Sequence, residues 1–255
     1  GQDEVAAHVQ QTLDEKGVGH SHCRSWPGEN GFARVTLVNG DRVFKGSNRG
    51  GVLQEHPIAL EPSDMEYLAS FQLIHTTNNG FTDSLLPILH TLPSMVSYDF
   101  SYRWNEEDRL ARVCPYVDFA FLSCSDLDEE ATRNLCLRLN QMGCGVVTAT
   151  RGSKGATVYD GAHFYRQLPH LVEPVDTMGA GDSFATAMLI HLLNAMEPER
   201  RTKWDSELFR GGNHPQLPLD HGSPFISAQT CLTHGAFGCG TPVPESVRAR
   251  IYEGG

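Results

Sequence analysis

The chain has 255 residues, of which 40% are apolar and 20% charged, so it is long enough for one large α/β domain or two small ones with a substantial core. Its formal net charge of −11 argues against a nucleic-acid partner, because proteins that bind the phosphate backbone carry a basic surface. No apolar run approaches the ~20 residues of a membrane span and no signal peptide is visible, so we expect a cytoplasmic protein with no membrane partner.

The seven cysteines are odd in number and include no Cys-x-x-Cys pair. This spacing excludes a zinc ribbon. We expect them to be reduced, buried thiols of a cytoplasmic protein.

The first elements in the chain are a helix and a hairpin. Residues 3–18 place apolar side chains at helical spacing, and Gly17 is expected to end this helix. In residues 32–46, two short strands flank Asn39-Gly40, a dipeptide typical of a tight hairpin turn. Because the hairpin stands between helical segments, we expect it to be a small β lid, around residues 31–55, or an edge flap of the sheet.

Four later segments are rich in β-branched and aromatic residues and alternate with helical patterns: residues 71–77, 95–103, 117–125 and 145–152. This alternation predicts a parallel sheet with right-handed crossovers. Ligands of such sheets bind at the carboxyl ends of the strands. We therefore expect one edge of the sheet to gather six polar residues: His75, Asp99, Ser101, Arg103, Ser123 and Thr150.

Residues 175–193, VDTMGAGDSFATAMLIHLL, combine a glycine-rich turn with an apolar helical pattern. The first N–H groups of a helix have no partner within it, and small side chains let an anion approach them. We expect Gly179, Ala180 and Gly181 to precede the helix and to bind a tetrahedral oxyanion or a phosphoryl group. Asp182 has two interpretations: it caps the helix, or it takes a proton from a substrate hydroxyl during phosphoryl transfer.

Two further patterns limit the alternatives. The chain has no G-x-x-x-x-G-K-[ST] loop, and no G-x-G-x-x-G follows a first strand, so a P-loop or a dinucleotide-binding turn is not indicated. Residues 200–224 are rich in glycine, proline and histidine without a clear period. We expect them to form a long, irregular surface loop.

The segment DTMGAGD, residues 176–182, with its following apolar helix, resembles the second signature of the ribokinase-like, or PfkB, carbohydrate kinases. Residues 146–161 are similar to that family's nucleotide-binding strand and turn. Residues 96–103 resemble its Asp-x-Asn-x-Arg strand, with Ser101 in place of Asn. The likeness covers nearly the whole chain apart from residues 200–224, and it is greatest to the fructoselysine 6-kinase branch of the family.

This resemblance implies an α/β fold, a ribokinase-like three-layer sandwich with a central, mostly parallel sheet and a small β lid. It implies a single kinase domain over residues 1–255, with an irregular insertion around residues 200–224. The chain shows no counterpart of the family's first strand, which carries a substrate-binding Asp, or of the segment that opens the first helix. We therefore expect an N-terminally truncated kinase that retains its ATP site and has a weakened affinity for the sugar.

The implied activity is ATP-dependent phosphorylation of a primary hydroxyl of a sugar or of a sugar–amine adduct. The implied partners are that small-molecule sugar and ATP, with Mg²⁺ as the metal; a requirement for K⁺ and a homodimer through the lid are left open. Two other functions also stay open. One is a catalytically impaired relic or a sugar or nucleotide sensor, which the missing opening segment and Ser123 motivate. The other is a ribokinase-like vitamin kinase with the same glycine-rich site.

The resemblance also assigns the catalytic turn. Asp182 is implied as the base that activates the sugar hydroxyl. The anion hole for the γ-phosphoryl group is implied at Gly179, Ala180 and Gly181.

The nucleotide and metal sites follow from the same resemblance. The nucleotide site is implied at Thr150, Gly152, Gly155 and Ser227. Asp126 is implied to help hold hydrated Mg²⁺, which keeps several waters. The position of a monovalent-cation loop is implied at Asp176 and Thr177.

Three substrate-side residues each keep a structural alternative. Arg103 is either a charge near the phosphates or one partner of a surface salt bridge. Asp99 is either a substrate contact or a structural acceptor at the end of a strand. His75 is expected to end a strand, as a substrate contact or as a satisfied core histidine.

Overall fold

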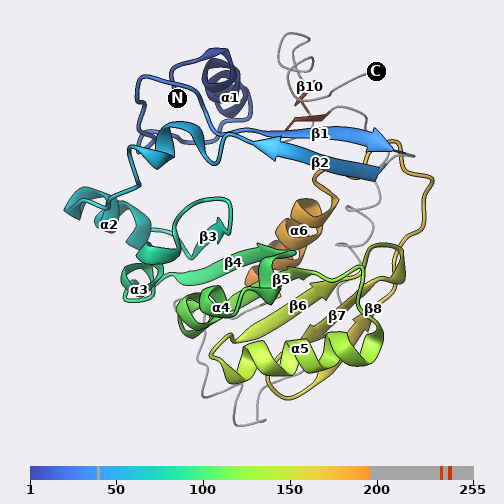
Figure 1. The fold of residues 1–255 in the computed structure, drawn as a ribbon. Helices are drawn as coiled ribbons and strands as arrows, with labels where there is room; N and C mark the ends of the chain where they lie inside the picture. The colour runs from blue at the N-terminus through green and yellow to red at the C-terminus, as the bar shows by residue number, and fades with distance from the viewer. Residues whose placement is uncertain (39–40, 196–235, 238–240, 243–255) are drawn as a thin grey trace. The chain divides into compact units, whose positions relative to one another are not determined.

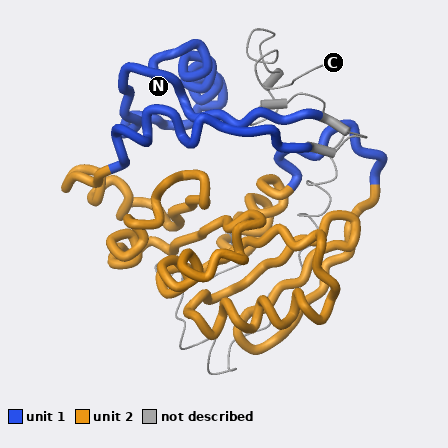
Figure 2. The backbone as a smooth tube through the Cα atoms, viewed as in Figure 1, with its two compact units in different colours: residues 1–58, 172–180, 227–255 blue, residues 59–171, 181–226 orange. Residues whose placement is uncertain are grey.

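The computed structural model describes residues 1–38, 41–195, 236–237 and 241–242 (Figure 1). The chain divides into two compact units, which Figure 2 colours separately. Unit 1 comprises residues 1–58, 172–180 and 227–255, and unit 2 comprises residues 59–171 and 181–226. The prediction of a single domain with a lid and an insertion stays a prediction, and residues 200–224 lie outside the described residues.

Unit 1 contains the predicted helix and hairpin. Helix α1 (Glu4–Glu15) begins after Asp3, whose side chain accepts a hydrogen bond from the Ala6 N–H at 2.9 Å, and Gly17 with φ 65° follows its end. Strands β1 (Ala33–Val38) and β2 (Asp41–Ser47) pair antiparallel as a separate small sheet. Both predictions are confirmed, although the turn at residues 39–40 lies outside the described residues.

The remaining elements of unit 1 are short. They are the 3₁₀ helix η1 (Gly51–Gln54) and an antiparallel pair of two-residue strands, β9 (Ala236–Phe237) and β10 (Thr241–Pro242).

Unit 2 is built on a six-stranded sheet in the order β3-β4-β5-β6-β7-β8. The first four strands are parallel, and β7 and β8 continue the sheet antiparallel. The four segments predicted as parallel strands are therefore confirmed. The strand bounds are β3 (Leu73–Thr77), β4 (Met95–Ser101), β5 (Phe119–Ser123), β6 (Val146–Thr150), β7 (Ala156–Tyr159) and β8 (Phe164–Gln167).

Helices cover both faces of this sheet, with α5 in front and α6 behind in the view of Figure 1. Alternate strand residues face opposite ways, so Val96 and Tyr98 join one buried cluster, whereas Met95 joins the other with Phe184 and Met188 of α6. The helix bounds in unit 2 are α2 (Pro62–Ala69), η2 (Asp83–Leu85), α3 (Leu86–Leu89), η3 (Arg103–Asn105), α4 (Glu107–Val113), η4 (Cys114–Tyr116), α5 (Glu129–Gln141), η5 (Gly152–Lys154) and α6 (Ala180–Ala195), whose first residue belongs to unit 1.

Side chains and one glycine fix the ends of the central strands. The buried Asp118 accepts a hydrogen bond from the Val96 N–H at 2.7 Å, which joins the starts of β4 and β5. Gly155 has φ 88°, and a Cβ there would lie 2.2 Å from the Gln167 carbonyl oxygen, so only glycine fits against the end of β8.

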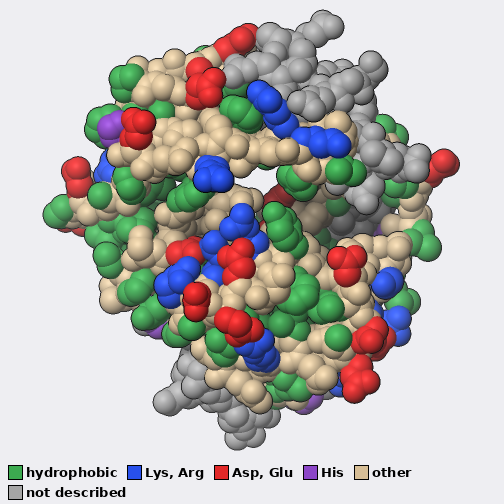
Figure 3. All heavy atoms as spheres, in the orientation of Figure 1, with side chains coloured by type: hydrophobic (Ala, Val, Ile, Leu, Met, Phe, Trp, Pro, Cys, Tyr) green, Lys and Arg blue, Asp and Glu red, His purple; other side chains and the backbone are tan. Residues whose placement is uncertain are grey.

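The structure also describes one face of the surface and five of the cysteines. On the face drawn in Figure 3, acidic and basic side chains are interspersed. In the described part of the chain, no helix is both long and apolar enough to span a membrane. Four of the five described cysteines are buried free thiols as expected, but Cys23 is exposed because it lies in a loop of unit 1.

Candidate active site

The carboxyl ends of β3 and β4 bring polar side chains onto the face of the sheet that α6 covers. His75 and Ser97 are register partners, and the His75 Nδ1 lies 3.0 Å from the Ser97 Oγ. Asp99 follows two residues after Ser97 and therefore shares its face. Because the two strands are parallel and in register, they deliver His75 and Asp99 to one face of the sheet.

His75 differs from its prediction in position and in burial. It is the third of the five residues of β3 rather than the last, and it is exposed, so the interpretation as a core histidine is wrong. The surrounding protein atoms still desolvate the ring and lower the pKa of His75, while the negative charge of Asp182 opposes this shift. The ring is therefore neutral at physiological pH and keeps one nitrogen able to accept a hydrogen bond.

Helix α6 begins earlier than the sequence predicted. It starts at Ala180, directly after Gly179 with φ 75°, so Ala180 and Gly181 form part of its first turn instead of preceding it. The Ala180 N–H donates to the Thr177 carbonyl at 3.2 Å, and the Met178 N–H donates to the Asp176 carboxylate at 2.9 Å. These bonds form the turn within unit 1, and the boundary between the units falls after Ala180.

Asp182 is the third residue of α6, and its side chain is exposed. An N-cap precedes the first helical residue, so the interpretation of Asp182 as the cap is wrong. The carboxylate lies close enough to β3 and β4 for its charge to act on both His75 and Asp99. The described part of unit 2 thus brings together three of the sequence-predicted site residues.

Asp99 carries the largest electrostatic perturbation in this group. Burial raises its pKa to about 6, against the effect of the Ser101 N–H, which donates to the carboxylate at 2.6 Å, and the negative charge of Asp182 adds to the rise. No basic side chain contributes to this pKa among the residues that the structure describes. A half-buried carboxyl group next to a second carboxylate is a candidate for proton transfer or for binding a cation.

Ser101 turns the chain out of the sheet. Its φ of 51° lies in the left-handed region, and the pairing with β5 is irregular between Asp99 and Ser101. Serine adopts this conformation less readily than asparagine or glycine, so the hydrogen bond to Asp99 contributes to holding it. The chain then enters η3, which carries Arg103.

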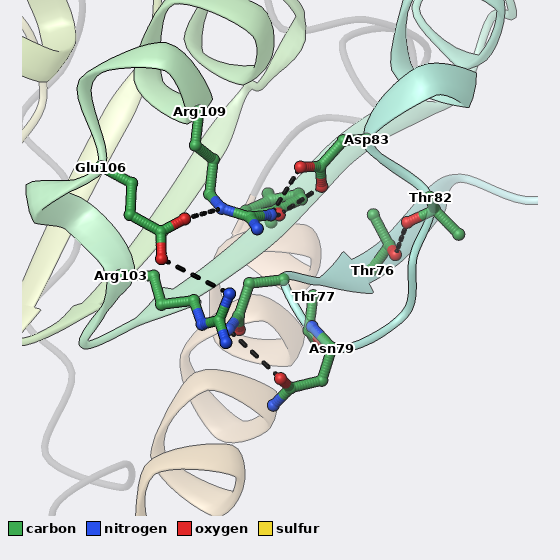
Figure 4. Close-up of polar contacts among 10 residues, drawn as sticks. Thr76, Thr77, Asn79, Thr82, Asp83, Arg103, Glu106 and Arg109 are labelled. Atoms are coloured by element: carbon green, nitrogen blue, oxygen red, sulfur yellow. Dashed lines mark hydrogen bonds and ion pairs between the residues drawn. The ribbon is translucent and has the colours of Figure 1, made fainter. Parts of the chain in front are cut away.

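Arg103 and its neighbours form a chain of ion pairs at the end of β4 (Figure 4). The Arg103 Nη1 lies 3.4 Å from Glu106 Oε1, and the Arg109 Nε donates to Glu106 Oε2 at 2.8 Å. Arg109 also donates to the carboxylate of Asp83 and, at 3.1 Å, to the hydroxyl oxygen of Tyr98. The salt-bridge interpretation of Arg103 is thus borne out as geometry.

Asn78 is a site candidate that the sequence analysis missed. It follows β3 directly, its N–H donates to the Asp99 carbonyl at 3.0 Å, and only 6% of the residue is exposed. Among the described residues, its buried Oδ1 has no hydrogen-bond partner. A buried acceptor without a donor costs free energy, so the position suits a ligand hydroxyl, an amino group or a water. Its place directly after a predicted strand was the signal that could have identified it.

The predicted nucleotide residues lie at the end of β6. The Thr150 hydroxyl donates to the Leu122 carbonyl at 3.2 Å, and Gly152 opens η5. Gly155 has the packing role against β8 described above, and Ser227 lies outside the described residues. Contact of these residues with a nucleotide stays a prediction.

The predicted metal ligands are dispersed. Asp126 is exposed in the turn between β5 and α5, and Asp176 is buried in the turn before α6 with Thr177 beside it. The described residues contain no group of three or more His, Cys, Asp or Glu side chains placed to hold a metal. Mg²⁺ in kinases takes one or two carboxylates together with waters and phosphates, so an exposed Asp126 fits that role.

Comparisons with known sequences identify the family. The profile of the pfkB family carbohydrate kinases matches residues 1–203. Fructosamine kinase FrlD of Bacillus subtilis (strain 168) is 34% identical across 100% of this chain and 81% of its own length. Fructoselysine 6-kinase of Shigella flexneri is 34% identical over 74% of this chain and 70% of its own length.

Comparisons with solved structures support the fold. A ribokinase of Thermotoga maritima matches with a TM-score of 0.64 at 15% identity, covering 98% of this chain and 78% of that one. Arabidopsis thaliana ribokinase complexed with ribose and ATP matches with a TM-score of 0.63 at 16% identity. The match covers 91% of this chain and 79% of that one. A putative ribokinase II from E. coli in complex with ATP and Mg²⁺ matches with a TM-score of 0.61 at 20% identity. The match covers 79% of this chain and 70% of that one.

These findings confirm the predicted ribokinase-like α/β fold, with its mostly parallel central sheet and separate small antiparallel sheet. Structures solved with ATP and Mg²⁺ also agree with the cofactors expected for a kinase. The match to the family profile over most of the chain identifies this protein as a member of the PfkB family of carbohydrate kinases, and thus as a sugar kinase.

Proposed function

We propose that the protein transfers the γ-phosphoryl group of ATP to a primary hydroxyl of a sugar–amine adduct of the fructosamine class, such as fructoselysine. The observation that carries this proposal is the exposed Asp182 in the first turn of α6, next to Asp99 and His75. The names of two relatives, a fructosamine kinase and a fructoselysine 6-kinase, support the substrate class.

The charge at this site suits an adduct that carries an amine. Asp99 and Asp182 repel each other, and burial raises the pKa of Asp99 to about 6, so at neutral pH most Asp99 carboxyls bear an unfavourable charge. A protonated secondary amine would compensate that charge, whereas a neutral sugar would not. The His75 ring and the Asn78 Oδ1, which has no hydrogen-bond partner among the described residues, are available to contact sugar hydroxyls.

The proposed reaction moves one proton and one phosphoryl group. The substrate oxygen forms a bond to the γ-phosphorus, the bond from that phosphorus to the bridging oxygen of ADP breaks, and Asp182 takes the hydroxyl proton. The N–H groups of Gly179 and Gly181, with the positive end of the α6 dipole, stabilise the phosphoryl oxygens, whereas the Ala180 N–H already donates to the Thr177 carbonyl and would have to exchange that bond to take part. Arg103 adds a positive charge on the phosphate side. Mg²⁺, when bound, neutralises negative charge on the phosphates.

The proposal also assigns the metal sites, the nucleotide site and the dimer contact. Asp126 would hold Mg²⁺ through its waters, and the turn containing Asp176 and Thr177 would hold K⁺. Thr150, Gly152 and Gly155 would line the nucleotide site. A homodimer through the β1–β2 hairpin and a cytoplasmic location also belong to this proposal.

A turnover assay with ATP and Mg²⁺ tests the proposed function. The panel contains fructoselysine, a second fructosamine, fructose, ribose and a hydroxymethyl heterocycle, with the Asp182→Asn variant as the blank. We expect the fructosamines to give the highest kcat/KM. Phosphorylation of the heterocycle alone would indicate a vitamin kinase, and ATP binding without a phosphorylated product from any compound would indicate a sensor; either result would overturn the proposal.

A further inference from the structure

The backbone that carries Arg103 is held firmly, but its side chain is not. In η3, the Trp104 indole N–H donates to the Ser123 carbonyl at 2.8 Å, which joins η3 to the end of β5. The Arg103 side chain remains 39% exposed, and its ion pair with Glu106 at 3.4 Å is half exposed. A long side chain with one exposed ion pair samples several rotamers, so its direction depends on how well Glu106 itself is held.

Glu106 lies between two arginines and uses a different oxygen for each. Its Oε2 accepts the hydrogen bond from Arg109 Nε at 2.8 Å, and its Oε1 is the atom that faces Arg103. The hydrogen bond from Arg109 is the main cause that lowers the pKa of Glu106, so the carboxylate stays ionised in neutral solution. Figure 4 shows each guanidinium group joined to a different oxygen of this carboxylate.

Arg109 is in turn anchored in the protein. Its side chain is 12% exposed and donates both to Asp83 of η2 and to the Tyr98 hydroxyl of β4. The Tyr98 O–H donates to the other Asp83 oxygen at 2.6 Å, and the tyrosine is fully buried. The chain of contacts from Tyr98 to Arg103 therefore begins in the core and ends at an exposed charge.

We propose that Glu106 is a positioning residue, which orients Arg103 toward the transferring phosphoryl group, and that Arg109 fixes Glu106 for this task. The inference rests on the proposed function, because it takes Arg103 as the charge on the phosphate side. Glu106 itself touches neither substrate nor nucleotide in this proposal. Its role is to reduce the number of directions in which the Arg103 guanidinium points.

The substitution Glu106→Gln distinguishes an effect on the orientation of Arg103 from an effect on side-chain packing. Glutamine keeps the length of the side chain and one acceptor oxygen for Arg109, but it loses the charge that attracts Arg103. We expect kcat to fall about fivefold, the upper range for one exposed ion pair, with little change in the KM for ATP. The matched control is Glu107→Gln, which removes the neighbouring carboxylate and its exposed ion pair with Arg138; it is expected to leave kcat unchanged.

A double-mutant cycle tests whether Glu106 acts through Arg103. In an Arg103→Ala background, the further change Glu106→Gln is expected to have no additional effect on kcat, because its target is gone. An undiminished effect in that background, or a single Glu106→Gln variant with the kcat of the unsubstituted protein, would overturn the proposal.

A second measurement does not depend on turnover. In ¹⁵N NMR spectra, the Nε–Hε signal of Arg103 is assigned by its loss in Arg103→Ala. In Glu106→Gln its chemical shift is expected to move toward the value of a freely rotating arginine side chain, whereas in Glu107→Gln it is expected to stay the same. An unchanged signal would contradict the positioning role. If no compound of the panel is phosphorylated, the proposed function fails while this spectrum still decides the role of Glu106.

Discussion

At the end of β4, charged groups are paired with opposite charges on one face of the sheet and lie beside a like charge on the other. Tyr98 faces the cluster with Asp83 and Arg109, in which a carboxylate, a guanidinium and a hydroxyl satisfy one another. Asp99, the next residue, faces α6, where the negative charge of Asp182 raises its pKa further. Compensated charges hold a fold together, whereas a carboxylate left beside a like charge is stabilised only by a ligand or a proton. The comparison thus separates the scaffold from the reacting face.

The largest effect is expected from Asp182→Asn on the uncompensated face. Asparagine cannot take the hydroxyl proton, so kcat should fall about 10³-fold. The free energy of unfolding should stay the same or rise, because the substitution removes a charge that repels Asp99. Steady-state kinetics, urea denaturation and calorimetric ATP binding check these points; a variant that keeps its turnover would show that Asp182 is not the base.

On the face that carries Tyr98, Asp83 and Arg109, substitutions should change the free energy of unfolding instead of kcat. Arg109→Met leaves Asp83 without its cationic partner and removes the bond to Tyr98, so the free energy of unfolding should fall by about 2–3 kcal/mol. Arg138→Met removes a largely exposed pair with Glu107 and should leave the free energy of unfolding almost unchanged. Urea denaturation of both variants measures the difference. Equal losses would mean that the Arg109 cluster does not stabilise the fold.

Asp99→Asn should give a pH-dependent gain in stability. The folded-state pKa of Asp99, about 6, lies above its ordinary value of 3.8, so the folded protein binds the proton more tightly. Its contribution to the free energy of unfolding is therefore fully present below about pH 4 and is lost as pH rises through 6.

Relative to the unsubstituted protein, Asp99→Asn should accordingly gain about 2–3 kcal/mol above pH 6 and nothing near pH 4. The amide keeps an acceptor for the Ser101 N–H, which limits other changes. Denaturation at several pH values gives the profile. A gain that is the same at every pH would refute the assigned cause.

The smallest expected change in the free energy of unfolding is at Ser101, where the chain leaves the end of β4. Ser101→Asn places a residue that tolerates φ near 51° where serine is strained, so the free energy of unfolding should rise by about 0.5 kcal/mol. Ser123→Asn is a suitable control, because Ser123 also ends a strand but is not among the residues with positive φ. Thermal denaturation compares the two, and a loss of stability in Ser101→Asn would contradict the strain.

The local patterns of the sequence were sufficient for the elements and for the family. Alternating apolar strands and helices predicted β3 to β6 because a buried parallel sheet requires such runs, and Gly17 marked the end of α1. The residues around DTMGAGD predicted the helix with Asp182 near its start. The start of α6 was misplaced by two residues, because small residues are compatible with both a turn and a first helical turn.

What only the tertiary structure decided is how distant residues compensate one another's charge. Asp83 and Arg109 are 26 positions apart, and Asp182 is far along the chain from both His75 and Asp99. No local pattern encodes which carboxylate receives an arginine, because packing of the sheet and its helices sets these distances. The sequence by itself determined a kinase fold with a candidate base, and the folded chain decided which charges of its described part are paired with an opposite charge.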